Sequence, residues 1–138
     1  MATDIYPSRC AAEPELLARR DPVVHAEWHA DAPLSREQAD GFERDGYLVL
    51  ENVFDADEVA ALQSETARLL GDPSALDGET VITEPGGREI RSIFEIHAQS
   101  AVMARLAADE RLADVARFLL GDEVYIHQSR LNYKPGFQ

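Results

Sequence analysis

A row of polar side chains with the spacing of one strand face lies near the end of the chain. The sequence from Val124 to Lys134 reads VYIHQSRLNYK, and alternate side chains of an extended strand point to the same side of a sheet. After two apolar residues, one face carries Gln128, Arg130, Asn132 and Lys134, all of which can donate hydrogen bonds. Two amides, a guanidinium and an ammonium turned into one cavity would suit a small polar or anionic ligand.

The same alternation has a second interpretation. The polar row could be a solvated outer face, with Tyr125, Leu131 and Tyr133 packed into the core, because polar-out alternation is common in antiparallel sheets. The spacing alone leaves both interpretations open. In either case it predicts one long strand from Val124 onward, ending at the loop that Pro135 begins.

Helices precede this strand and would have to position it. Helical periodicity and capping signals predict helices over 36–44, 56–70, 100–107 and 110–120. Ser35 with Gln38 forms a capping box at the first of these, and an Asp-Glu pair repeats the pattern at the second. Gly46, Gly71 and Gly121 are predicted to end helices, since glycine favours the left-handed cap conformation.

Shorter apolar stretches predict the remaining elements. Strands are expected over 47–50, 81–83 and 90–96, which gives about four with the last one. Residues 1–34 are rich in proline and lack periodicity, so they are predicted to form an irregular N-terminal arm. Residues 35–138 would form one α+β domain, in which front helices lead into a sheet.

Six segments of the chain resemble one enzyme family, in that family's order and spacing. They are DIYPSR (4–9), RRDPVV (19–24), PLSREQ (33–38), DGYLVLENVF (45–54), IRSIFEIH (90–97) and VYIHQSRLNYKPGF (124–137). Through them the chain resembles the N-terminal part of the ectoine hydroxylases, a branch of the phytanoyl-CoA dioxygenase-like oxygenases that use iron(II) and 2-oxoglutarate. The resemblance covers nearly the whole sequence.

The resemblance implies a fold that this chain contains only in part. The family fold is a double-stranded β-helix, or jelly roll, flanked by helices, and such a fold needs about eight strands. We therefore expect N-terminal helices plus the first strands of an incomplete jelly roll. Residues 35–138 would be the N-terminal part of a dioxygenase domain, truncated before the iron-binding motif.

The resemblance also implies roles for single residues. Lys134 matches the lysine that pairs with a 2-oxoglutarate carboxylate, and Asn132 matches a neighbour that hydrogen-bonds the same cosubstrate. Gln128 matches a residue that contacts ectoine. Phe94 is a weaker candidate for lining the pocket, and Arg130 on the shared face is as consistent with an ion pair as with a ligand contact.

No metal ligand is assigned in this sequence. The family's first two iron ligands form a His-x-Asp motif that follows the Lys-Pro-Gly-Phe segment, and no His-x-Asp occurs in the 138 residues. His25 and His29 are spaced i, i+4, yet no Glu-x-x-His pattern or third ligand accompanies them. We therefore predict that the chain alone is inactive, and that Fe(II) and 2-oxoglutarate belong to the full-length family.

Composition excludes several classes of partner. The 13 basic and 26 acidic residues give a net charge of −13, which argues against nucleic-acid binding and against docking on an anionic membrane. The N-terminus lacks the apolar stretch of a signal peptide, and one cysteine permits no internal disulfide, so a cytoplasmic protein is predicted. The resemblance allows a homodimer in the full-length form.

Two classes of function follow. The first is the N-terminal portion of an oxygenase that hydroxylates the compatible solute ectoine to 5-hydroxyectoine, or a related oxygenase acting on another small substrate. The second is a non-catalytic, acidic α+β binding or structural module. The gene sequence beyond codon 138 discriminates between them, because the first class predicts a His-x-Asp motif shortly downstream.

Overall fold

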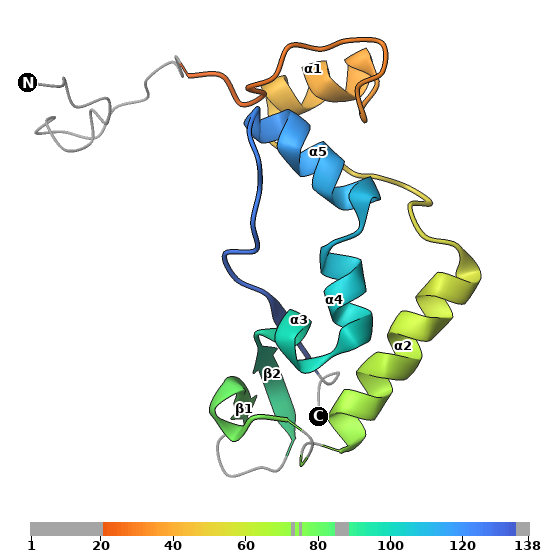
Figure 1. The fold of residues 1–138 in the computed structure, drawn as a ribbon, viewed down its shortest axis with the longest axis vertical. Helices are drawn as coiled ribbons and strands as arrows, with labels where there is room; N and C mark the ends of the chain where they lie inside the picture. The colour runs from red at the N-terminus through yellow and green to blue at the C-terminus, as the bar shows by residue number, and fades with distance from the viewer. Residues whose placement is uncertain (1–20, 73, 75, 85–88, 135–138) are drawn as a thin grey trace, which may run out of the picture.

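The computed structural model describes residues 21–72, 74, 76–84 and 89–134, and its elements form two packed groups joined by loops (Figure 1). The helical elements are α1 (Arg36–Asp45), α2 (Ala56–Gly71), the 3-10 turn η3 (Gly78–Thr80), α3 (Ile96–Gln99), α4 (Ala101–Ala107) and α5 (Glu110–Leu120). The strands are β1 (Val81–Thr83), β2 (Ile90–Phe94) and β3 (Arg130–Asn132). The predicted α+β class is confirmed.

The first group contains α1, α5 and residues 21–34 of the arm, which form neither helix nor strand. Leu34, Ala39 and Phe118 are its buried centre. The arm is tied down by its main chain, since the N–H of His25 donates to the Leu119 carbonyl at 2.9 Å. The arm therefore packs on the helix that leads toward β3. That the arm forms a unit separate from residues 35–138 stays a prediction.

The second group packs α2 and α4 on one face of the sheet. Ile93 is completely buried and forms a cluster with Leu69 of α2 and Met103 of α4. Val81 and Leu131, from the two outer strands, pack against the same cluster. One face of the sheet is thus covered by helices, and burial of these side chains supplies much of its stability.

The sheet is antiparallel, with β2 in the centre and the order β1-β2-β3. Ser92 lies opposite Asn132, and Phe94 lies opposite Arg130. Because side chains alternate across a sheet, the residues next to Ile93 and Leu131 point to the face that the helices leave uncovered.

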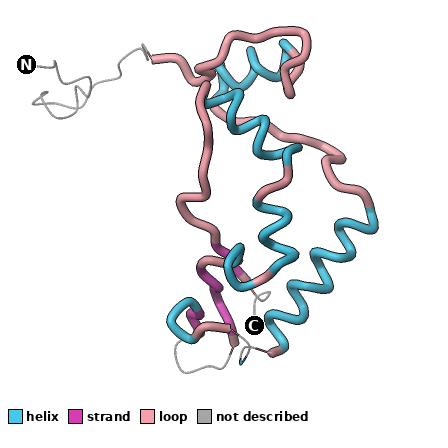
Figure 2. The backbone as a smooth tube through the Cα atoms, viewed as in Figure 1, coloured by secondary structure: helices cyan, strands magenta, loops and turns pink. Residues whose placement is uncertain are grey.

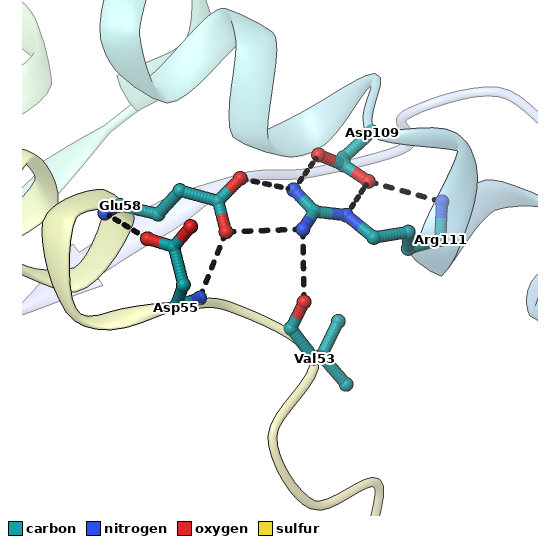
Figure 3. Close-up of polar contacts among 5 residues, drawn as sticks. All are labelled: Val53, Asp55, Glu58, Asp109 and Arg111. Atoms are coloured by element: carbon teal, nitrogen blue, oxygen red, sulfur yellow. Dashed lines mark hydrogen bonds and ion pairs between the residues drawn. The ribbon is translucent and has the colours of Figure 1, made fainter.

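A cluster around Arg111 joins the N-terminal ends of α2 and α5 (Figure 3). The guanidinium donates to both carboxylate oxygens of Glu58, at 2.7 and 3.0 Å, to Asp109, and to the Val53 carbonyl at 2.9 Å. These hydrogen bonds raise the pKa of Arg111 further above its usual range and lower the pKa of Glu58 and of Asp109. The cluster holds the two groups of elements together.

The helices agree closely with the predictions, whereas several strand predictions are wrong. Both capping boxes are present, and Gly46 and Gly121 end α1 and α5 with φ of +76° and +68°. α2 ends at Gly71, within one residue of the predicted end, but Gly71 is its last helical residue and Asp72 rather than a glycine is the cap. Residues 47–50 form no strand; Tyr47 and Val49 are exposed and Leu48 packs inward, so the alternation is present without a partner strand.

The predicted long final strand is also mostly wrong. Only Arg130–Asn132 pairs with β2, and the segment between α5 and β3 runs as a loop (Figure 2). The reason lies in β2, which was predicted to reach residue 96 but ends at Phe94. Glu95 adopts a left-handed φ of +51° and turns the chain into α3, so residues 124–129 have no strand to pair with.

Among the described residues, no helix is long and apolar enough to cross a membrane.

Candidate functional site

The uncovered face of the sheet carries a pocket of about 360 Å³, a size that accommodates a small molecule. All three strands contribute to it. The residues that line it are Ile82, Arg91, Ser92, Phe94, Arg130, Asn132, Tyr133 and Lys134. The pocket lining combines apolar and aromatic side chains with cations and hydrogen-bonding groups.

Strand register explains why these residues meet. Asn132 lies opposite Ser92, which in turn lies opposite Ile82 of β1, so one residue of each strand faces the pocket at this level. One step along, Arg130 lies opposite Phe94. The predicted alternation therefore holds for Arg130 and Asn132, which β3 contains. Beyond β3 it does not hold, because Lys134 lines the same pocket together with Tyr133, which was predicted to lie on the opposite face.

Ser92 and Asn132 are joined across the ladder. The Ser92 hydroxyl, which is 7% exposed, donates to Oδ1 of Asn132 at 2.8 Å. This bond uses the amide oxygen and leaves the amide nitrogen to donate elsewhere. Asn132 is itself solvent-exposed at the pocket, so its amide N–H groups can reach a ligand.

The basic residues of the pocket differ in their partners. Arg91 pairs with Glu84 at 3.8 Å, while Arg130 lies over the ring of Phe94, with 5.3 Å between its guanidinium carbon and the ring centroid. Lys134 is the only lysine of the sequence and forms no salt bridge with any described carboxylate. Two cations that form no ion pair with a described carboxylate therefore face one pocket of a strongly acidic protein, which favours an anionic ligand.

Gln128 is placed differently from the prediction. It is exposed in the loop before β3 and is not among the residues that line the pocket. The neighbouring Ser129 is fixed to the turn after β2, because its carbonyl accepts from the Glu95 N–H at 2.9 Å and its hydroxyl contacts Nδ1 of His97 at 2.5 Å. These contacts fix the chain immediately beside Gln128.

The alternative interpretation of the alternation, with the tyrosines in the core, is wrong for both tyrosines. Tyr125 is 83% exposed and Tyr133 is 43% exposed, and only Leu131 packs against the buried cluster. Tyr125 belongs to the loop, where no sheet orders its side chain; its ring meets that of His127 edge-on, with centroids 6.4 Å apart.

Within the described residues, no group of three or more His, Cys, Asp and Glu side chains could hold a metal ion. The iron that the resemblance implies therefore finds no ligand set among the described residues. His97 contacts Ser129, and His25 lies in the docked arm. We derive no chemical step through a metal.

Sequence reasoning missed Ser92, Ile82 and Arg91 as pocket residues. The register of β2 would have found Ser92, because it is a small polar residue that lies, next to Arg91, between two buried isoleucines, Ile90 and Ile93. A small hydroxyl residue in such an apolar strand has to find a hydrogen-bond partner.

Comparison with known proteins agrees with this architecture. Residues 42–137 match the family described as phytanoyl-CoA dioxygenase (PhyH). The chain belongs to this family.

Curated PhyH relatives carry one common name. The chain is 70% identical over 135 residues to the ectoine dioxygenase of Sphingopyxis alaskensis, covering 98% of this chain and 44% of that protein. It is 48% identical over 137 residues to the ectoine dioxygenase of Stutzerimonas stutzeri, covering 99% and 45%. The chain spans less than half the length of these relatives.

Solved structures agree as well. EctD from S. alaskensis in its apoform superposes with a TM-score of 0.87 at 70% identity, over 98% of this chain and 48% of that one. Two further crystal structures of that protein, one with 2-oxoglutarate and 5-hydroxyectoine and one with bound Fe, give TM-scores of 0.86 and 0.88 with the same coverage. The fold predicted from the resemblance is confirmed.

Proposed function

We propose that this chain is the N-terminal portion of an oxygenase that hydroxylates ectoine to 5-hydroxyectoine, using 2-oxoglutarate and O₂. The observation that carries the proposal is the pocket on the uncovered sheet face, which is lined by Asn132 of β3, by Lys134 just beyond β3, and by Ser92 of β2. The named relatives support it, because they are ectoine dioxygenases over almost all of this chain.

In this proposal Lys134 and Asn132 bind 2-oxoglutarate. The ammonium of Lys134 would pair with a carboxylate, and the Asn132 amide, held by Ser92, would donate to the same molecule. The pocket suits a dianion such as 2-oxoglutarate, because the cations and amide N–H groups in its lining outnumber the hydrogen-bond acceptors there. The bound molecule would have its acidic end fixed against β3.

Gln128 would contact ectoine from the loop before β3. Its amide can donate to the carboxylate of ectoine and accept from a ring N–H. Because Ser129 is bonded to Glu95 and His97, the backbone position of Gln128 is defined even though no strand contains it. Gln128 lies outside the pocket. It would therefore contact an ectoine molecule that binds next to the 2-oxoglutarate in the pocket.

Iron(II) would activate O₂ in such an enzyme, and its ligands would have to come from outside the described residues. The 138-residue chain alone should therefore form no succinate from 2-oxoglutarate, with iron(II) and ectoine present, above a control without protein. A cytoplasmic location, a role in osmotic stress and a homodimer also belong to this proposal.

The direct experiment assays the product of the complete open reading frame that contains this chain. Purified protein with iron(II), 2-oxoglutarate and ectoine should form 5-hydroxyectoine and succinate in equal amounts, measured by chromatography. In that protein, Lys134→Ala should raise the KM for 2-oxoglutarate about tenfold or more and leave the KM for ectoine within about twofold. An unchanged requirement for 2-oxoglutarate would remove Lys134 from the site.

The second candidate is a non-catalytic acidic module that binds a small anion. Arg130 and Lys134, which pair with no carboxylate among the described residues, favour it over a purely structural role. It predicts binding of dicarboxylates without turnover, even by the product of the complete gene. Formation of 5-hydroxyectoine would exclude it.

A further inference from the structure

The loop before β3 is attached to the end of β2 through one residue, Ser129. Its carbonyl accepts a hydrogen bond from the Glu95 N–H at 2.9 Å. Its hydroxyl contacts the backbone N–H of His97 at 3.3 Å and Nδ1 of the same residue at 2.5 Å. Among the described residues, no hydrogen bond joins residues 124–128 to the rest of the chain. The contacts of Ser129 therefore fix where this loop meets the sheet.

The Ser129 hydroxyl is both an acceptor and a donor toward His97. A backbone N–H can only donate, so the hydroxyl oxygen accepts from the His97 N–H. The hydroxyl hydrogen is then donated to Nδ1 of a neutral imidazole, which carries its own hydrogen on Nε2. Both residues are half-buried, so water competes only in part for these bonds. Alanine at position 129 could form neither contact, whereas threonine could form both.

The backbone at the end of β2 is arranged for these contacts. Continuing the ladder past the Phe94–Arg130 pair would place Glu95 opposite Ser129. Glu95 instead adopts a left-handed φ of +51°, which is strained for a residue with a Cβ, and brings His97 to the Ser129 hydroxyl. Strained backbone persists where surrounding contacts fix it, and it is common at functional sites.

We propose that His97 is a positioning residue, which fixes Gln128 at the ectoine site by binding the hydroxyl of the next residue, Ser129. The inference rests on the proposed function, in which Gln128 contacts ectoine. The Cα atoms of neighbouring residues are about 3.8 Å apart, so fixing Ser129 limits where the Gln128 amide can lie. A side chain that is ordered before the ligand arrives loses less freedom on binding. His97 itself touches no ligand in this account.

The test compares variants that remove the contact with variants that keep it, in the product of the complete gene. Ser129→Ala and His97→Leu remove it. Ser129→Thr keeps the hydroxyl, and His97→Asn keeps an acceptor, because Oδ1 of asparagine is as many bonds from Cα as Nδ1 of histidine. The KM for ectoine should rise about fivefold in the first two variants, as expected for the loss of one hydrogen bond. The second two should stay within about twofold of the wild type.

The KM for 2-oxoglutarate distinguishes positioning from a purely structural role. It should stay within about twofold of the wild type in all four variants, because the proposed cosubstrate residues are fixed separately by the bond from Ser92 to Asn132. An unchanged KM for ectoine in Ser129→Ala and His97→Leu would overturn the inference. Equal rises in the KM values of both ligands would also overturn it, since they indicate a general loss of structure.

A double-mutant cycle shows whether the effect passes through Gln128. In a Gln128→Ala background the amide is already gone, so adding Ser129→Ala should change the KM for ectoine by less than about twofold. A further fivefold rise in that background would mean that Ser129 and His97 act by another route, and the inference would be wrong.

If the wild type forms no 5-hydroxyectoine, the proposed function fails separately. Amide hydrogen exchange then decides about His97, because the N–H groups of Glu95 and His97 both donate to Ser129. Faster exchange of these two amides in Ser129→Ala, with wild-type rates in Ser129→Thr, supports a contact that fixes the loop. Equal rates in all three proteins overturn it.

Discussion

The Ser92 hydroxyl donates a hydrogen bond to Oδ1 of Asn132 across the β2–β3 ladder, 2.8 Å long and 40 residues apart in sequence. The bond fixes which end of the Asn132 amide faces the pocket. With the oxygen held by Ser92, the nitrogen becomes the donor that a ligand carboxylate meets. A buried serine thus orients an exposed asparagine.

Removing this hydroxyl should weaken cosubstrate binding without changing the fold. Ser92→Ala removes one hydrogen bond of about 1 kcal/mol, so the KM for 2-oxoglutarate should rise about fivefold through the less ordered Asn132 amide. Ser92→Thr keeps the hydroxyl and should remain near the wild type. An unchanged KM in Ser92→Ala, with the variant folded by circular dichroism, would show that Asn132 does not depend on Ser92.

Substitutions at two glycines can measure how closely the arm packs on the end of α5. Gly46 and Gly121 both end helices with positive φ, but a Cβ on Gly46 would meet nothing within 4 Å, whereas one on Gly121 would lie 3.0 Å from Cβ of His25. Gly46→Ala should lower the free energy of unfolding by about 1 kcal/mol, the cost of left-handed backbone. Gly121→Ala should cost at least about 1 kcal/mol more, because the arm must move.

Urea unfolding of the two variants and the wild type measures how much unfolding free energy each variant loses. Equal losses in the two variants would mean that the arm does not pack on Gly121. The comparison is matched, since backbone strain is common to both sites and only the contact with His25 differs.

Glu65 should make stability depend on pH in the acid range. Hydrogen bonds from Arg68, and then from Ser100, lower the pKa of Glu65 from 4.5 to about 2. A carboxyl whose pKa is lower in the folded state stabilises the protein above its unfolded pKa, and this contribution disappears as the pH falls from about 4.5 to about 2. Glu65→Gln should therefore show a shallower fall in unfolding free energy between about pH 5 and pH 2.

The measurement is chemical denaturation of Glu65→Gln and the wild type at several pH values across that range. Other carboxyl groups whose pKa is lowered, such as those of Glu58 and Asp109, contribute equally to the stability of both proteins and cancel in the difference. Parallel curves for the two proteins would mean that the pKa of Glu65 is not lowered.

The helices were predictable because their determinants are local. Ser35 with Gln38 at α1, and Asp55 with Glu58 at α2, form the hydrogen bonds that their spacing predicts. Capping uses residues three positions apart, so it needs no knowledge of the rest of the fold. Gly71 shows the limit of such predictions, since α2 does end there but the cap is the next residue, Asp72, and not the glycine.

The strands depended on partners that sequence could not supply. Residues 47–50 have the alternation of a strand but pack by side chains alone, and residues 124–129 lose their partner when Glu95 turns the chain away. Ser92 was not predicted at the pocket for the same reason, because its place there follows from its pairing with Asn132. Alternation correctly placed Asn132 with Arg130 on the pocket face of β3, whereas Lys134 and Tyr133 both line the pocket from just beyond the strand.

Binding of 2-oxoglutarate at Lys134 can be tested directly, because Lys134 is the single lysine of this sequence. The protein is treated with an amine-acylating reagent with and without 2-oxoglutarate, and acylation of the peptide that follows Arg130 is measured by mass spectrometry. We predict that 2-oxoglutarate slows acylation of Lys134, while its uncharged dimethyl ester does not. Equal acylation under all conditions would contradict the account.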